Sequence, residues 1–131
     1  VRGLNGFAGP ATWMAVRNPL EREIKNGFLH PYGNWQDRVG VWRFVRDIPY
    51  EANHPSLSLL SDTEKSLEGF SQTPSLSCWG MRDFCFHSGF LDKWETIWPN
   101  LVSHRLKDAG HYLLEDNFEG CRSKIEPFLF G

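Results

Sequence analysis

Two short apolar runs with one helical segment between them constrain the fold of this chain most. Residues 74–79 and 101–106 have the length and apolar character of buried strands, and residues 90–98 between them are typical of a helix. Strands joined by a single helix run parallel, because the helix returns the chain to the same end of the sheet. With a final helix expected over residues 115–128, the sequence predicts a β-α-β-α segment of an α/β fold.

An acid and a histidine follow the two predicted strands. Asp83 comes shortly after the first strand, and His111 comes after the second. Because the carboxyl ends of parallel strands meet at one edge of a sheet, where open α/β sheets hold their sites, we expect a hydrogen bond between these side chains. A carboxylate on one ring nitrogen fixes the tautomer of a histidine and stabilises the imidazolium that forms when the other nitrogen takes a proton. Asp83 and His111 are therefore the candidate catalytic residues.

Two sets of segments carry a resemblance. They are Trp79–Asp83, Phe90–Trp94 and Ala109–Asp116 in the second half of the chain, and Asn5–Val16, Pro31–Trp35 and Phe44–Pro49 in the first half. The second-half set resembles the carboxyl-terminal core of the haloalkane-dehalogenase-like α/β-hydrolases, and the first-half set resembles the helical cap of that family. Within the family, the chain is most similar to the branch that contains the β-lactone decarboxylases of long-chain olefin synthesis.

The resemblance implies the carboxyl-terminal part of an α/β-hydrolase fold. Residues 1–73 would form the helical cap, and residues 74–131 would form the carboxyl-terminal portion of the core. The boundary lies where aromatic helical segments give way to alternating strands and helices. Such hydrolases are roughly twice as long as this chain or longer. We therefore expect the 131 residues, which begin at Val1, to belong to a longer protein whose first strands lie upstream.

The same resemblance implies covalent catalysis on a small hydrophobic substrate such as a haloalkane, an epoxide or a β-lactone. An aspartate nucleophile on a strand-to-helix elbow attacks an electrophilic carbon and forms an ester, and the histidine then serves the second half of the reaction. In dehalogenases and epoxide hydrolases the histidine activates water, whereas in the lactone decarboxylases the attached intermediate loses carbon dioxide and gives an alkene. The sequence contains neither such an elbow nor a G-x-S-x-G motif, so the fragment alone is expected to be inactive.

Two other functions stay open at the level of sequence. A serine-type ester hydrolase of the same fold would share Asp83 and His111 and would differ in its nucleophile. A truncated module without enzymatic activity is favoured if 131 residues are the natural product, because no nucleophile is then available. The upstream coding sequence discriminates between these functions.

Other carboxylates near the pair have structural interpretations. Asp108 is closer in sequence to His111 than Asp83 is, but we expect it to shape the turn that follows the second strand. Glu115 and Asp116 are expected to be charges at the start of the final helix, where the helix dipole favours acids.

The cysteines and the remaining histidines do not indicate a further site. Cys85 stands between two phenylalanines, not in the electropositive setting that activates a thiol, and is expected to be buried or to line a pocket. The other histidines lack paired metal-ligand spacing, so neither a metal nor a cofactor is expected.

Composition excludes several partners. The formal net charge of −2 gives no basic field to attract nucleic acid or an anionic membrane surface. No stretch of about 18 apolar residues is present, so no membrane span is expected. Aromatic residues make up 15% of the chain, which favours a large apolar surface that packs or lines a pocket. Three cysteines without disulfide spacing indicate the reducing cytoplasm, and the oligomeric state stays open.

Several helices are expected before the first strand. They cover residues 11–16, 21–26, 35–48 and 62–69. Gly27 is expected to end the second helix as a left-handed cap, while Asn34 and Asp62 are expected to cap the starts of the third and the fourth. The third helix carries an aromatic stripe, formed by Trp35, Trp42 and Phe44, that is expected to pack within the cap, with part of it open to facing a substrate.

Overall fold

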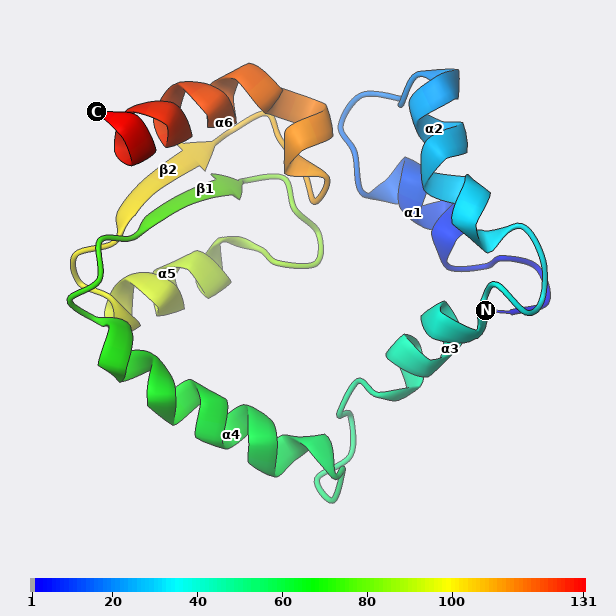
Figure 1. Cartoon of the computed structure of the whole chain (residues 1–131), viewed down its shortest axis with the longest axis horizontal. Helices are drawn as coiled ribbons and strands as arrows, with labels where there is room; N and C mark the ends of the chain where they lie inside the picture. The colour runs from blue at the N-terminus through cyan, green and yellow to red at the C-terminus, as the bar shows by residue number, and fades with distance from the viewer. Residues whose placement is uncertain (1) are drawn as a thin grey trace. The chain divides into compact units, whose positions relative to one another are not determined.

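The computed structural model describes residues 2–131, and the chain divides into two compact units. The first unit consists of the residues up to Met14 together with Leu20–Lys65. The second consists of Ala15–Pro19 and Ser66–Gly131. The order of the elements along the chain can be followed in Figure 1. The assignment of residues 1–73 to a cap and of residues 74–131 to a core portion stays a prediction.

The first unit is helical. Its elements are α1 (Ala8–Met14), α2 (Arg22–Leu29), the 3₁₀ helix η1 (His30–Tyr32), α3 (Val39–Arg46) and α4 (Ser56–Ser66), the last residue of which belongs to the second unit. Within the described residues 2–75 no strand is present, as the sequence predicts.

Arg38 organises the connection between η1 and α3. Its guanidinium donates hydrogen bonds to the backbone carbonyls of Tyr32 (2.8 Å), Arg2 (2.8 Å) and Gly33 (2.9 Å). The Arg2 guanidinium in turn lies 4.3 Å from the ring centre of Trp35 and donates to the Trp35 carbonyl at 3.0 Å. Because a guanidinium presents several donors in a fixed plane, Arg38 can hold carbonyl groups of the connection between η1 and α3 and of the N-terminal segment at once.

The second unit contains the predicted β-α-β-α segment. A short 3₁₀ helix, η2 (Leu67–Phe70), is followed by β1 (Leu76–Gly80), α5 (Ser88–Ile97), β2 (Val102–Leu106) and α6 (Leu113–Phe130). The two strands pair in parallel, with Leu76 opposite Val102 at one end and Gly80 opposite Leu106 at the other. The prediction of adjacent parallel strands is confirmed, and the unit is α/β in character.

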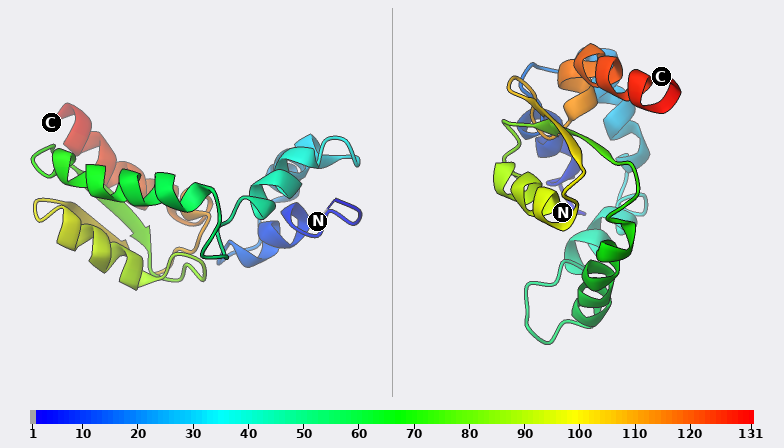
Figure 2. Two further views of the ribbon diagram at one scale, coloured as in Figure 1. Left: turned by 90° about the horizontal axis from the view of Figure 1, so that it is seen from below. Right: turned by 90° about the vertical axis from the view of Figure 1, so that its left-hand side faces the viewer.

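Alternate residues of β1 face different helices. The thiol of Cys78 is hydrogen-bonded to the buried thiol of Cys121 on α6, and burial raises the pKa of both thiols. The next residue, Trp79, points to the other face of the sheet because successive side chains of a strand alternate. Accordingly, α5 and α6 lie on opposite faces of the two strands, as Figure 2 shows.

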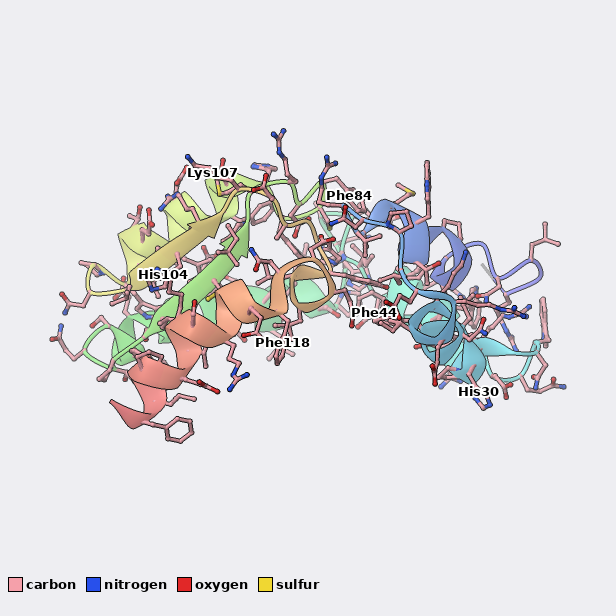
Figure 3. All side chains as sticks on the ribbon, turned by 90° about the horizontal axis from the view of Figure 1, so that it is seen from above. His30, Phe44, Phe84, His104, Lys107 and Phe118 are labelled. Atoms are coloured by element: carbon pink, nitrogen blue, oxygen red, sulfur yellow. The ribbon has the colours of Figure 1, made fainter. Side chains whose placement is uncertain are left out.

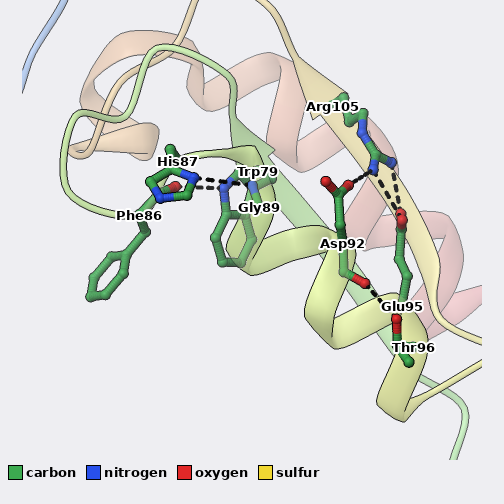
Figure 4. A network of polar contacts seen from close by, with 8 residues as sticks. All are labelled: Trp79, Phe86, His87, Gly89, Asp92, Glu95, Thr96 and Arg105. Atoms are coloured by element: carbon green, nitrogen blue, oxygen red, sulfur yellow. Dashed lines mark hydrogen bonds and ion pairs between the residues drawn. The ribbon is translucent and has the colours of Figure 1, made fainter.

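Ion pairs attach α5 to its face of the sheet. Arg105, which stands opposite Trp79 in the register, reaches Glu95 at 2.6 Å and Asp92 at 2.8 Å on α5. Figure 4 shows this fork, in which one guanidinium bridges two acids that are nearly one helical turn apart. Leu91 of α5 is fully buried, so the helix also contributes to the small core of this unit.

The last helix contains a break near its start. Asn117 has the non-helical backbone angles φ −152° and ψ 65°, and its side-chain oxygen accepts a hydrogen bond from the Gly120 N–H at 2.9 Å. This is the geometry of an N-cap, because a side-chain oxygen satisfies a free N–H of the next turn. Asp116 is therefore the last residue of a short first segment, and the main part of α6 begins after Asn117.

Three predicted helix ends in the first unit are wrong. Gly27 lies inside α2, which continues to Leu29. The helix placed at Asp62 begins earlier, at Ser56, directly after a proline whose missing N–H is tolerated at a helix start. Asn34 accepts hydrogen bonds from the next residues but caps a turn, since α3 begins only at Val39.

The aromatic stripe does not pack as predicted. The side chains of Trp35 and Phe44 are 53% and 64% exposed, respectively. Trp35 stands outside α3, which begins at Val39, and Phe44 is two positions from Trp42, a spacing that puts the two rings on different sides of the helix.

Among residues 2–131, the structure contains no helix that is both long enough and apolar enough to cross a bilayer.

Candidate active site

The loops after the two strands start at the same edge of the sheet. Gly80 and Leu106 end β1 and β2 in register. Beyond them, the Met81 N–H donates to the Leu106 carbonyl and the Arg82 N–H donates to the Ala109 carbonyl, both at 2.9 Å. The strand pairing thus continues into the loops and fixes the backbone on which both candidate residues stand.

Close backbone contact at Gly80 depends on the absence of a side chain. A Cβ atom at this position would lie 2.8 Å from the carbonyl oxygen of Ala109 and still closer to that of Gly110. Both obstacles are backbone atoms, which cannot rotate away. The glycine therefore lets the loop that carries His111 lie directly against the end of β1.

The structure brings Asp83 and His111 together. Oδ2 of Asp83 lies 2.9 Å from Nδ1 of His111. The other carboxylate oxygen, Oδ1, accepts hydrogen bonds from the N–H groups of Cys85 (2.7 Å) and Phe86 (2.9 Å). With the proton on Nδ1, the imidazole satisfies the carboxylate and directs its basic nitrogen, Nε2, elsewhere. The predicted hydrogen bond is confirmed, while the catalytic role of the pair stays a prediction.

The environment of Asp83 favours its ionised form. Burial raises the pKa of this carboxyl, since its side chain is only 10% exposed, but the hydrogen bonds from Phe86, His111 and Cys85 outweigh burial and hold the pKa below its usual value. The His111 side chain is 31% exposed. An ionised carboxylate behind a more accessible imidazole is the arrangement that stabilises an imidazolium during proton transfer.

Aromatic rings surround the imidazole. The ring centres of Phe86 and Phe84 lie 5.5 Å and 6.1 Å from that of His111. Both phenylalanines are themselves exposed, and Figure 3 shows Phe84 on the loop that follows β1. The histidine therefore stands in an apolar surface suited to a hydrophobic ligand.

The loop between β1 and α5 is held at its far end. The indole N–H of Trp79 donates to the Phe86 carbonyl at 2.8 Å, and Nδ1 of His87 accepts a hydrogen bond from the Gly89 N–H at 3.2 Å (Figure 4). His87 is thus the N-cap of α5. These contacts anchor the end of the loop that carries Asp83.

Asp108 and Cys85 are both exposed on the loops near the pair. Asp108 lies exposed in the turn after β2, and the carboxylate that reaches His111 is that of Asp83. Of the two expectations for Cys85, burial is wrong, because this cysteine is exposed, while a place in the wall of a pocket stays a prediction. Its N–H closes the turn around Asp83, and such a tight turn at the surface leaves the thiol outside the core.

Within residues 2–131, no group of three or more His, Cys, Asp or Glu side chains is arranged to hold a metal ion.

Sequence reasoning missed one residue at the site. Asp116 lies in the first turn of α6, as the sequence predicts, and in addition its Oδ2 accepts a hydrogen bond from the Gly110 N–H and its Oδ1 accepts one from the Arg17 N–H, both at 2.7 Å. Arg17 lies 99 positions away in the sequence. Local pattern carries no signal for such a contact.

The chain is similar in sequence to two proteins named as decarboxylases. It is 37% identical over 130 residues to a cis-3-alkyl-4-alkyloxetan-2-one decarboxylase from Shewanella oneidensis, and 33% identical over 129 residues to a protein of the same name from Xanthomonas campestris pv. campestris. Each match covers 98% of this chain, which spans 41% and 43% of the length of these relatives. No family model matches the chain.

Proposed function

We propose that this chain is the carboxyl-terminal part of an enzyme with an α/β-hydrolase fold that converts a β-lactone with alkyl substituents into an alkene and carbon dioxide. Asp83 and His111 are its acid and histidine. The observation that carries the proposal is the 2.9 Å contact between Asp83 Oδ2 and His111 Nδ1 at the carboxyl ends of two parallel strands. The name shared by the two relatives supports the substrate class.

The first half of the reaction uses a nucleophile from the part of the protein that precedes this chain. An aspartate carboxylate attacks C4 of the lactone, the saturated ring carbon bonded to the ring oxygen, and the bond between C4 and the ring oxygen breaks. The products of this step are an ester on the protein and a free carboxylate on the neighbouring carbon. No proton is consumed.

His111 acts in the second half. The bond between the substrate carbon and its carboxylate breaks and releases carbon dioxide, its electron pair forms the alkene, and the ester C–O bond returns its pair to the aspartate. Nε2 of His111, the ring nitrogen that Asp83 does not hold, lies towards the ester, and when protonated it donates a hydrogen bond to the aspartate carboxylate that is released, where the negative charge develops. Asp83 supports this role because it accepts a hydrogen bond from Nδ1–H and so fixes the orientation of the ring.

The surroundings of His111 fit a substrate with alkyl arms. Phe84 and Phe86 present exposed rings within 6.1 Å of the imidazole, measured between ring centres. Apolar surface of this kind also keeps water away from the ester. Exclusion of water matters, because water activated by the same histidine would hydrolyse the ester to a β-hydroxy acid instead of an alkene.

Product analysis tests the proposal. The full-length enzyme is incubated with a synthetic cis-3,4-dialkyloxetan-2-one, and the alkene and the β-hydroxy acid are quantified by gas chromatography. We expect the alkene as the product, with its formation lost in His111→Ala. Formation of the β-hydroxy acid alone would show a hydrolase, and unchanged alkene formation in His111→Ala would remove the assigned role of the histidine.

A further inference from the structure

Asp116 uses both of its carboxylate oxygens to hold backbone near His111. Oδ2 accepts a hydrogen bond at 2.7 Å from the N–H of Gly110, the residue directly before His111. Oδ1 accepts one at 2.7 Å from Arg17 and a longer one at 3.4 Å from Asn18. The donors come from two segments far apart in the sequence, so this one side chain ties the histidine loop to the segment Ala15–Pro19.

A backbone contact completes the tie on the other side of the histidine. The N–H of Tyr112, the residue directly after His111, donates to the carbonyl of Ala15 at 2.8 Å. The segment also lies close to Gly110, where a Cβ would come within 3.1 Å of the Ala15 carbonyl oxygen and 3.2 Å of Asp116 Oδ2. Both neighbours of His111 are thus fixed to the same five-residue segment, Ala15–Pro19, one directly and one through Asp116.

The chemistry of the site requires a carboxylate. A carboxylate only accepts hydrogen bonds and can receive N–H groups on both oxygens, and bonds to its charge are stronger than bonds between neutral groups. An asparagine would present an NH₂ group to one set of N–H donors and leave them without an acceptor. Asn117, and not Asp116, caps the main part of α6. The carboxylate of Asp116 is therefore available to bind the backbone near His111.

We propose that Asp116 is a positioning residue that fixes the loop of His111 and thereby sets the place of its imidazole relative to the bound substrate. This inference rests on the proposed function, because only that function gives His111 a substrate to act on. Asp83 orients the ring through Nδ1, whereas Asp116 holds the backbone from which the ring extends. A displacement of about 1 Å at a reacting group lowers a rate by up to about 100-fold.

The test compares full-length variants on a cis-3,4-dialkyloxetan-2-one probe. Asp116→Asn keeps the size of the side chain and should lower kcat by about 10- to 100-fold, with KM within about twofold of wild type, because the substrate surface is intact. The low-field proton NMR signal of His111 Nδ1–H should broaden or disappear in this variant. A role in stability alone would lower the unfolding temperature without moving this signal in protein that is still folded.

Two further variants complete the design. Glu115→Gln removes an exposed acid from the same turn of α6 and should keep the wild-type kcat and NMR signal. Gly110→Ala leaves Asp116 in place but introduces the Cβ that crowds Ala15, and it should lower kcat in the same way as Asp116→Asn. A lowered kcat in both Asp116→Asn and Gly110→Ala supports the positioning role. If one of the two variants folds poorly, the kcat of the other still tests it.

The outcomes separate this inference from the proposed function. Wild-type kcat and an intact Nδ1–H signal in Asp116→Asn, while His111→Ala is inactive, would overturn the positioning role and leave the proposed function standing. Full activity in both Asp116→Asn and His111→Ala would overturn the proposed function itself.

Discussion

Asp83 is the residue on which the site depends, because its carboxylate connects the histidine to the loop after β1. Its pKa lies below the usual value although burial alone would raise it, since the N–H groups of Phe86 and Cys85 and the ring of His111 bind the ionised form. The folded protein therefore binds a proton at Asp83 less readily than the unfolded chain does.

This lowered pKa predicts a pH dependence of stability. The contribution of Asp83 is fully present above the unfolded pKa of about 3.9 and is lost as the pH falls through the lower folded pKa. The unfolding temperature of the full-length protein should therefore exceed that of Asp83→Asn at neutral pH, and this difference should shrink towards about pH 3. A pH series of thermal unfolding curves measures it. A difference that stays constant down to that pH would contradict the lowered pKa.

The sequence predicts the place of a residue that directly follows a strand. It does not predict the place of a residue that depends on contacts with distant parts of the chain. Asp83 and His111 each follow a recognisable strand, so their proximity could be derived from the parallel order. The bond from Arg17 to Asp116 spans most of the chain, and the exposure of Cys85 depends on how a turn closes around Asp83. Neither leaves a periodic pattern in the sequence.

At the scale of elements, the ends of β1 and β2 determine the site. Their register places Gly80 opposite Leu106, and the loop of His111 crosses Gly80 in close backbone contact. This contact needs a position without a side chain, so a small substitution here acts on both stability and catalysis.

Gly80→Ala should destabilise the protein and lower its activity. The added Cβ meets backbone carbonyls at Ala109 and Gly110, and overpacking of this kind costs about 1–3 kcal/mol and displaces the loop of His111. Gly69→Ala is the matched control, because a Cβ at Gly69 has no neighbouring atom within 4 Å. Denaturant unfolding and kcat should both change in the first variant only. Equal behaviour of the two variants would show that the close contact at Gly80 has no role.

The elements of the second unit were predicted more accurately than those of the first. Short apolar runs, Pro99 and the strand-helix alternation determine β1, α5 and β2, since strand length and helix stops are local properties. In the first unit, glycine and acid positions were interpreted as helix ends, but Gly27 and Asp62 lie inside helices because neighbouring residues continue the hydrogen-bonded turns. Composition alone does not decide between an end and an interior position.

At the scale of the whole molecule, much apolar surface is uncovered within the described residues. The sheet formed by residues 2–131 has two strands, and an open hollow of about 460 Å³ beside β1 is lined by Trp94 and Trp98, among others. Unpaired strand edges and exposed apolar surface promote association with other chains.

The purified 131-residue chain should therefore be poorly soluble and inactive on its own. Production together with the preceding part of the protein should restore solubility, because that part would supply neighbouring strands and the nucleophile. Sedimentation and product assays on the chain alone and on the combined parts measure both effects. Alkene formation by the isolated chain would contradict this prediction, as it would show that no upstream nucleophile is needed.

The most direct test of the account is the turnover rate of the full-length enzyme after Asp83→Asn, measured with a cis-3,4-dialkyloxetan-2-one. An amide at this position carries no negative charge to stabilise His111 when its ring is protonated on both nitrogens during the reaction, so kcat should fall by about 10³- to 10⁴-fold while the fold is preserved. Asp108→Asn, which changes an exposed carboxylate that is nearer to His111 in sequence, should stay within about twofold of wild type. If Asp83→Asn kept full activity, or if Asp108→Asn lost it instead, Asp83 and His111 would not be the catalytic pair.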